Sequence, residues 1–367
     1  MPRYGLRRLY LLLLVPIALI TVLFAAKYPQ LTEQYFSQGL YLIIVPALTS
    51  LSGLFFVSLA EVALVVGILS FILYTARTVR TAVKDRDRRV YTLYTYVVNL
   101  CVIASVLYAG FVFLCGINYH RLPFADTAGL TVRNSSVAEL DLLCQELATA
   151  ANAQVKLISV GQDGTTTLAA TDFEAATDAV NAMKDMSKDY PFMRGLYSVP
   201  KPAAFSSVLS YAHISGIYIP YTFEATFNNQ IPDFSLPATM CHELAHQRGF
   251  MREDEANFIA YLACRSADNS YFNYAGTLHA LSFSLNWLRE ENSERYYDIY
   301  ESLDDTIKAD FAAYSRFWQR HEGAVSQVSA TVNNAYLMAN SQSDGVQSYG
   351  RMVDLLLADY RLRYNLS

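Results

Sequence analysis

The chain is poor in the residues that most often form disulfides or bind structural metals. Its 367 residues include five cysteines and six histidines. No two cysteines have the C-x-x-C spacing, which excludes the usual zinc-ribbon and thioredoxin-like patterns. Cys101 and Cys115 lie in an apolar segment, and the odd number of cysteines that remains excludes complete disulfide pairing elsewhere in the chain. Histidines are so few that every candidate metal ligand of this type can be considered in turn.

The chain also lacks an uninterrupted basic segment of the kind that binds nucleic acid. Its densest group of arginines and lysines runs over residues 77–89, and Asp85 and Asp87 interrupt it. This group lies between two apolar segments, which favours a role in membrane topology over contact with phosphates. We therefore expect no nucleic-acid partner.

Apolar residues are plentiful and are concentrated in the first third of the chain. Hydrophobic residues make up 53% of the sequence. Residues 9–26 and 96–115 each form an apolar run of about 18 residues or more, enough to cross the hydrocarbon core of a bilayer. Residues 9–26 also have features of a signal peptide, since they follow arginines and end in Ala25 and Ala26. The run is long for a signal peptide, so we prefer an uncleaved anchor.

A third apolar stretch, residues 40–74, is too long for one crossing. As a single helix rising about 1.5 Å per residue, it would overshoot the bilayer by roughly 20 Å. Pro46 and Gly53 are the positions at which it can break. We interpret residues 40–56 as an interfacial or re-entrant helix and residues 57–76 as the crossing.

The distribution of arginine and lysine predicts the orientation of these spans. Basic residues precede the first span and are dense between the second and the third, whereas residues 27–39 contain a single lysine. The positive-inside rule then places the amino terminus and the basic loop in the cytoplasm. We expect residues 1–116 to form a membrane domain with three crossings in contact with the lipid bilayer. Residues 117–367 would form one extracytoplasmic domain.

The motif that indicates chemistry is CHELAHQRGF, which starts at Cys241. On a helix, His242 and His246 lie one turn apart on the same face, so both imidazoles can reach one metal ion at about 2.0–2.1 Å. Glu243 lies beside them, where it can accept a proton from a metal-activated water. The H-E-x-x-H spacing is typical of zinc peptidases.

The residues around this motif favour a short helix. Ser235 can cap its start, Pro237 suits a first helical turn, and Gly249 can end it about one turn after His246. The alternative is a solvated helix that carries the pattern by chance.

The third ligand has few candidates. In the class with H-E-x-x-H-x-x-G-x-x-H, a third histidine follows, but Arg252 occupies that position here. Glu253 is the next residue and opens a second predicted helix over residues 253–266. Glu255 is the other candidate ligand, although a solvated first-turn carboxylate favoured by the helix dipole explains it at least as well.

Glu253 and Asn257 together resemble the E-x-x-x-D element of the glutamate-ligand zincins. With Ala256 they also resemble the E-x-x-A-D/N element of membrane-bound zinc peptidases. The resemblance implies that Glu253 is the third ligand and that Asn257 holds the imidazole of His242. Asparagine in place of aspartate is a departure from the first pattern, because a neutral amide accepts a weaker hydrogen bond.

The resemblance extends over nearly the whole chain. Three amino-terminal spans are followed by NYHR at residues 118–121, GIYIPYTFEA, CHELAHQRGF with EDEANF, and SYGRMVDLLL near the end. This combination resembles a family of bacterial membrane-anchored zincin-like proteins of unknown function. It implies a bacterial cell-membrane protein with a zinc-peptidase-like domain, and it supplies no substrate.

The expected fold of the outer domain is α+β, mainly helical, with a small sheet. Residues 207–228 are rich in β-branched and aromatic residues and predict strands, and Pro220 suits an edge strand on which a peptide could pair, although an ordinary core strand fits equally well. The helical pattern is clearest over six segments: residues 136–151, 171–189, 277–290, 302–320, 323–339 and 349–364.

We therefore expect a metallopeptidase that uses one Zn²⁺ held by His242, His246 and Glu253, with Glu243 as the base. Its substrate would be an envelope protein or peptide at the outer membrane face. Tyr349, His279 and Tyr218 are candidates for stabilising the oxyanion, and only Tyr349 lies in the carboxyl-terminal segment of the resemblance. The alternative is a non-catalytic envelope binding or scaffold protein that keeps the zincin fold. The intact Glu243 argues against that alternative.

Overall fold

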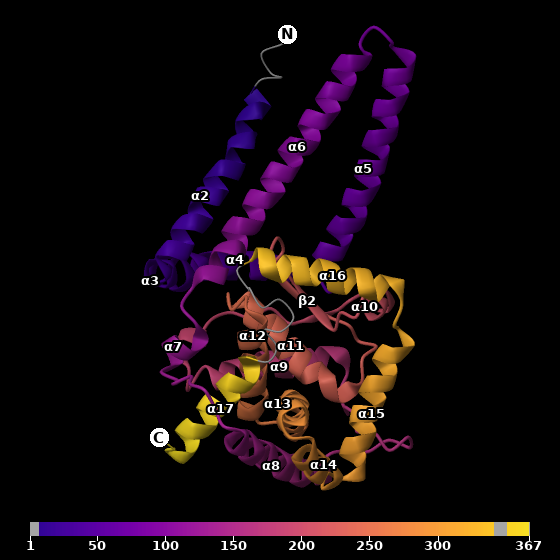
Figure 1. Cartoon of the computed structure of the whole chain (residues 1–367). Coiled ribbons are helices and arrows are strands. Elements are labelled where there is room, and N and C mark those ends of the chain that lie inside the picture. Colours follow the sequence, from indigo (N-terminus) through magenta and orange to yellow (C-terminus); the bar gives the residue numbers. More distant parts are fainter. Residues whose placement is uncertain (1–6, 341–350, 367) are drawn as a thin grey trace.

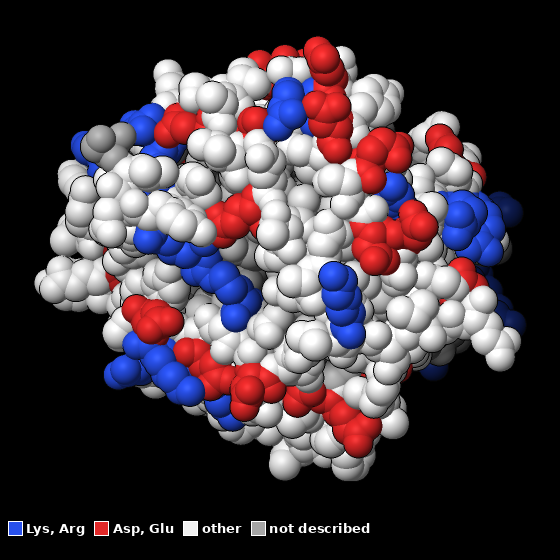
Figure 2. All heavy atoms as spheres, turned by 90° about the horizontal axis from the view of Figure 1, so that it is seen from below, with Lys and Arg blue, Asp and Glu red and all other residues white. Residues whose placement is uncertain are grey.

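The computed structural model describes residues 7–340 and 351–366 of the chain. These residues form a mainly helical body, and three long apolar helices rise from one side of it (Figure 1). The face of the body turned away from these helices carries acidic and basic side chains side by side (Figure 2).

Four helical stretches in the described part of the chain are long and apolar enough to cross a membrane, by length and composition. The first joins a 3₁₀ segment to α2 (Leu14–Lys27), and the second joins α3 (Pro29–Leu31), a π-helical segment (Thr32–Leu40) and α4 (Tyr41–Ser52). The others are α5 (Leu59–Lys84) and α6 (Arg89–Leu114). These helices are compatible with anchoring of the chain in a membrane.

Of the two positions at which residues 40–74 could break, the helix ends at Gly53 and continues through Pro46. Pro46 lies inside α4, which continues to Ser52 and ends at Gly53. A proline removes one backbone hydrogen bond from a helix interior, and packing on neighbouring elements can offset that loss. The packing comes from the body: Tyr41, at the start of α4, is fully buried, and its hydroxyl donates to the carbonyl of Gln247 at 3.2 Å.

A three-stranded sheet lies on the side of the body that faces the apolar helices (Figure 1). Its strands are β1 (Lys201–Pro202), β2 (Gly216–Ile219) and β3 (Glu224–Phe227). The order is β1-β3-β2, with β1 parallel and β2 antiparallel to β3. β2 is therefore an edge strand of the described sheet, as Pro220 in the turn after it suggested.

The first part of the predicted strand region is helical instead. Residues Ser206–Tyr211 form the short helix α10. The side chains of Ser206 and Ser210 donate to carbonyls of the preceding turn at 2.7 and 3.0 Å, a local pairing that competes with strand formation.

Helices make up the rest of the body. Two of them start with a capping box, formed by Ser136 with Glu139 and by Thr171 with Glu174. The central helix is α12, in which the run from Asp254 to Cys264 is buried without interruption. The helices in chain order are α7 (Phe124–Ala128), α8 (Val137–Gln154), α9 (Asp172–Met186), α10, α11 (Leu236–Gln247), α12 (Glu253–Ser266), α13 (Ser270–Glu291), α14 (Ser293–Glu301), α15 (Asp305–Arg320), α16 (Ala324–Ala339) and α17 (Arg351–Tyr364).

Buried polar contacts fasten the base of α5 to the sheet. Lys201 of β1 and Glu224 of β3 form an ion pair at 2.5 Å, with 9% and 1% of the two side chains exposed. The Glu224 carboxylate also accepts hydrogen bonds from the backbone N–H groups of Leu59 and Ala60, the first residues of α5. Such contacts place the sheet against the start of this helix.

A second buried ion pair crosses the boundary expected at residue 116. Arg121 donates to both carboxylate oxygens of Glu33, at 3.0 and 2.7 Å. It also donates to the carbonyl of Arg248, just after α11. The segment before α4 is therefore bonded to the body close to the HELAH helix.

Candidate metal centre

Helix α11 carries the H-E-x-x-H motif through the interior of the body. It starts at Leu236 with Pro237 at its second position, where the missing N–H costs nothing. The predicted cap by Ser235 is wrong, because Ser235 already has helical dihedral angles and its hydroxyl donates to the carbonyl of Pro232. Ten of the twelve residues of α11 are buried, so the alternative of a solvated helix is wrong as well.

Gly249 ends the helix and turns the chain back, as the sequence predicts. Its φ is +88°, a conformation that glycine adopts without strain. A Cβ at this position would also lie 3.0 Å from the side chain of Asn118. After this turn, α12 begins at Glu253, and its first residue faces the histidines of α11.

The three expected ligand groups converge. The Nε2 atom of His242 lies 3.3 Å from one oxygen of Glu253, and the Nε2 atom of His246 lies 3.6 Å from the other. All three donor atoms lie within 4.8 Å of one another. Four-coordinate zinc, with bonds of about 2.0–2.1 Å, holds its ligand atoms about 3.3–3.4 Å apart. The separations therefore suit one small divalent cation.

The other nitrogen of each imidazole has its own partner. His242 Nδ1 lies 2.9 Å from the amide oxygen of Asn257, and His246 Nδ1 lies 2.8 Å from the carbonyl of Phe250. Both acceptors favour the tautomer in which Nδ1 carries the proton and Nε2 has a free lone pair. This orientation is the one that metal-binding histidines require.

Glu243 is buried between α11 and the start of β2. One oxygen lies so close to Gly216 that a Cβ there would be 2.5 Å away, and the carboxylate lies near the backbone N–H of Tyr218. The second oxygen, Oε2, is buried and has no hydrogen-bond partner among the described residues. Gly216 is a contact that sequence reasoning missed, since a glycine opening a strand gives no sign of what it faces.

Burial and mutual contact shift the pKa values of all four groups. Burial raises the pKa of Glu243 to about 8. It also lowers the pKa of His246 to about 4, together with the charge of His242. Burial would likewise lower the pKa of His242, but its contacts with Glu253 prevail and raise it to about 9. Burial would raise the pKa of Glu253, yet the two histidines hold it below its ordinary value.

Glu255, the other candidate ligand, is directed elsewhere. Its carboxylate accepts a hydrogen bond from the backbone N–H of Phe124 at 2.8 Å and lies 4.0 Å from Arg252. The side chain is buried, so its reading as a solvated carboxylate is wrong too. Burial raises the pKa of Glu255 to about 7. The structure brings Glu253, and not Glu255, to the two histidines.

The three residues proposed to stabilise an oxyanion lie in different places. Tyr349 lies outside the described residues. The hydroxyl of Tyr218 lies 3.4 Å from that of Tyr41. His279 of α13 is close to the centre: its imidazole lies near the backbone of Asn257, and its Nε2 atom has no partner among the described residues.

A pair of tyrosines near the centre was not expected from the sequence. The hydroxyls of Tyr119 and Tyr336 lie 2.8 Å apart. Burial raises the pKa of both phenols, and the charge of Glu253 contributes to both shifts, so the pair lies within electrostatic range of this carboxylate. The two residues are too distant in sequence for any local pattern to have joined them.

Comparison with known proteins identifies the family and nothing more specific. A family model described as "Protein of unknown function (DUF3810)" matches residues 36–357, and the chain belongs to this family. The matched region includes α4 to α6 and all the residues of the centre described above. No curated protein and no solved structure matches the chain.

Proposed function

We propose that this chain is a membrane-anchored zinc-dependent metallopeptidase with a zincin-like domain. The observation that carries the proposal is the convergence of His242, His246 and Glu253, whose donor atoms all lie within 4.8 Å of one another. Glu243 lies next to His242 and offers a buried oxygen that has no partner among the described residues. Two imidazoles, one carboxylate and an adjacent carboxylate base are the donor set of a hydrolytic zinc site.

The donor set fits one zinc ion in chemistry as well as in spacing. Binding of zinc would displace the Nε2 proton of His242, so that two neutral imidazole nitrogens and one carboxylate oxygen would hold the ion. Three protein ligands are typical of catalytic zinc sites, which keep one position for water. Bound zinc supplies a Lewis acid that makes water acidic near neutral pH and polarises a peptide carbonyl. Asn257 and the carbonyl of Phe250 hold the imidazoles so that Nε2 faces the ion.

Glu243 is the group that moves the proton. Burial raises its pKa to about 8 when the site holds no cation. The charge of a bound zinc ion would lower this pKa and leave the carboxylate free to take a proton. In the proposed reaction, Oε2 accepts a proton from the attacking water and delivers it to the leaving amine. The contacts with Gly216 and with the N–H of Tyr218 fix the carboxyl in place while it does so.

The edge of the sheet offers a place for the peptide. Strand β2 is an edge strand in the described sheet and begins at Gly216, in contact with Glu243. An extended peptide can add to such an edge by backbone hydrogen bonds, which suits a substrate defined by its conformation more than by one side chain. The substrate we propose is therefore an extended segment of an envelope protein or peptide.

The location we propose is the outer face of a bacterial cell membrane. The arginines before α2 and the basic residues over 77–89, from the last turns of α5 to the start of α6, favour a cytoplasmic amino terminus, and the body then lies outside. We propose crossings by α2, α5 and α6, with α4 as an interfacial helix, because Tyr41 of α4 is buried against the body.

The test is the metal content and activity of the full-length protein in lipid nanodiscs. We expect about one zinc per chain, lost in His246→Ala and kept in the control His321→Ala, whose ring packs against Tyr211 of α10. We expect Glu243→Gln to keep zinc and to lower hydrolysis by on the order of 10²–10⁴-fold, the usual effect of removing a general base. Glu255→Gln, a second buried glutamate, should leave hydrolysis unchanged.

Wild-type protein without zinc would refute the proposal. Unchanged cleavage of membrane proteins in cells that carry Glu243→Gln would leave a binding or scaffold protein as the remaining interpretation.

A further inference from the structure

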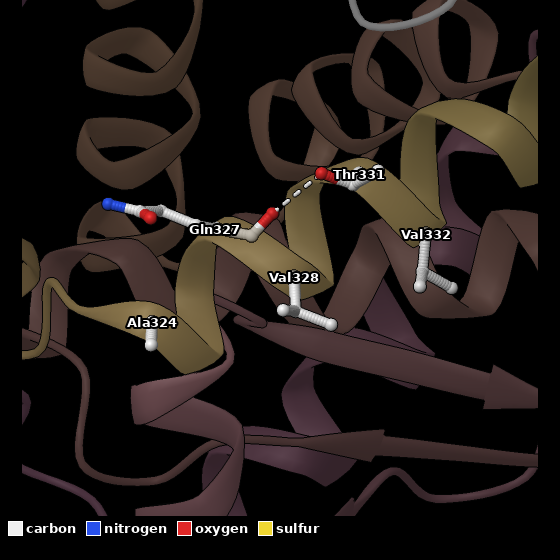
Figure 3. A pocket seen from close by; sticks show the side chains of 5 residues that line it. All are labelled: Ala324, Gln327, Val328, Thr331 and Val332. Carbon is white, nitrogen blue, oxygen red and sulfur yellow. Dashed lines mark hydrogen bonds between the residues drawn. The ribbon is translucent and has the colours of Figure 1, made fainter.

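Helix α16 has an unusual surface for a helix of a soluble body. Its 16 residues, AVSQVSATVNNAYLMA, include no charged side chain. Only Ser326 and Leu337 are buried. Val325, Val328 and Val332 are 56%, 64% and 62% exposed. Figure 3 shows Val328 and Val332 pointing to the same side of the helix, beside Ala324.

Water is a poor environment for such a surface. An apolar stripe on a helix is normally covered by the core, and large exposed apolar patches mark contact with a partner or a membrane. The opposite face of the body differs from α16, because acidic and basic side chains are mixed on it (Figure 2). We therefore expect a partner or a membrane to cover the exposed face of α16.

The position of α16 relative to the apolar helices indicates what covers it. In Figure 1 it lies across the top of the body, at the height of the lower ends of α5 and α6. The ring of its Tyr336 packs against Phe111 with centroids 6.1 Å apart, and Phe111 lies in the last turn of α6, which ends at Leu114. The helix α16 therefore lies at the level at which α6 would leave a bilayer.

A second exposed apolar surface lies at the same level, next to α5. The carboxylate of Glu61, in the first turn of α5, accepts hydrogen bonds from the N–H groups of Ala204 and Phe205, both at 3.0 Å. These bonds hold the start of α10 beside the start of α5. Phe205 and Val208 are 44% and 60% exposed there.

We propose that α10 and α16 rest on the lipid bilayer, and we call their exposed residues Phe205, Val208, Val325, Val328 and Val332 the bilayer-contact surface. The proposal rests on the membrane anchoring described above, and it depends on neither zinc nor hydrolysis. Two separate segments become apolar and exposed where each meets the end of a candidate membrane span, so the lipid that surrounds α5 and α6 also reaches them. A helix with an apolar face and a polar face can lie flat at the boundary between headgroups and acyl chains. In α16 the polar residues are serine, threonine, asparagine and glutamine.

This arrangement has a consequence for the substrate. Tyr336 of α16 bonds to Tyr119, and both phenols lie within electrostatic range of Glu253. The candidate centre therefore lies close to α16. On the proposed function, polypeptides embedded in or tethered to the membrane are the substrates nearest to it.

The test uses an environment-sensitive fluorophore on single cysteines of the full-length protein in phosphatidylcholine vesicles. Cys101 is the exposed native cysteine in the described chain and is replaced by alanine, while the four others are buried and do not react in the folded protein. Separate reporters are placed by Val328→Cys, Val332→Cys, Leu69→Cys and Tyr297→Cys. Quenching is measured with lipids that carry a nitroxide on the acyl chain at two depths, and with aqueous iodide.

Leu69 and Tyr297 are the internal references. Leu69 lies in α5 and Tyr297 in α14 at the opposite end of the body, and both are well exposed, at 55% and 61%. We expect lipid quenching at Leu69, Val328 and Val332, strongest with the shallow nitroxide for the two valine positions, and only iodide quenching at Tyr297.

Three results would contradict the proposal, and the pattern of quenching distinguishes them. If the reporters at Val328 and Val332 respond to iodide as Tyr297 does while Leu69 is quenched by lipid, the anchoring stands and the bilayer-contact surface is refuted. If neither quencher reaches the two positions, another protein segment covers α16, and the proposal is also wrong. Absence of lipid quenching at Leu69 would refute the anchoring itself.

Discussion

Gly216 and Glu243 are in such close contact that a methyl group does not fit between them. A Cβ at Gly216 would lie 2.5 Å from one carboxylate oxygen of Glu243, below any normal contact distance. The first residue of the edge strand β2 therefore sets the position of the proposed base. A peptide that pairs with β2 would also be positioned relative to Glu243.

This contact predicts that Gly216→Ala lowers hydrolysis and leaves zinc binding intact. The added methyl pushes the carboxylate aside, and a displacement of about 1 Å at a reacting group can cost about 10²-fold in rate. Zinc content by elemental analysis and hydrolysis of a membrane-protein substrate are the two measurements. Gly67→Ala is the matched control, because a Cβ at Gly67 meets nothing within 4 Å. Equal rates for the two variants would contradict the role of Gly216.

A second prediction concerns Asn257, whose amide oxygen lies 2.9 Å from His242 Nδ1. Removing this acceptor in Asn257→Ala should weaken zinc binding by about 10–100-fold, the usual cost of losing such a partner. Asn257→Asp restores an acceptor and adds a negative charge, so it should bind zinc at least as tightly as the wild type. Competition with a zinc-binding dye measures both affinities. A wild-type affinity in Asn257→Ala would show that His242 needs no such support.

A third prediction concerns acid stability and His279. Burial, with a smaller contribution from the charge of His242, lowers the pKa of His279 from 6.5 to about 3. Below pH 6.5 the unfolded chain gains a proton at this side chain that the folded chain does not take up. The free energy of unfolding should therefore fall by about 1.4 kcal/mol per pH unit between about pH 6 and pH 4, with no contribution above pH 7.

Thermal unfolding of the full-length protein at several pH values measures this slope. His279→Gln removes the titrating group, so its unfolding free energy should fall less steeply below pH 6 than that of the wild type. His321→Gln, at the residue that follows α15, is the matched histidine control. Parallel pH profiles for the wild type and His279→Gln would contradict the prediction.

A fourth prediction concerns the ion pair of Lys201 and Glu224 at the base of α5. Lys201→Met leaves the Glu224 carboxylate buried without its cation, and breaking a buried pair in this way typically costs about 3–5 kcal/mol of unfolding free energy. Lys188→Met is the control: Lys188 pairs with Asp185 on the surface, with 75% of the lysine side chain exposed, and should change stability by less than about 1 kcal/mol. Similar thermal unfolding of the two variants would show that the buried pair contributes little.

The sequence alone determined the features that depend on local spacing. The helix predicted over residues 253–266 is α12 (Glu253–Ser266), and the glycine predicted to end the preceding helix does so at φ +88°. The mainly helical body and the apolar helices near the amino terminus were also predicted from the sequence. Helical periodicity, turn glycines and apolar runs act between residues close in the chain, so a single sequence contains them in full.

Only the tertiary structure decided which distant residues meet. It placed Gly216 against Glu243, joined Tyr119 to Tyr336, and buried Tyr41 of α4 beside the end of α11. Such contacts depend on how whole elements pack and leave no periodic trace in the chain. The meeting of His242, His246 and Glu253 could be predicted because these residues lie within two successive helices, whereas the surroundings of Glu243 come from segments far apart in sequence.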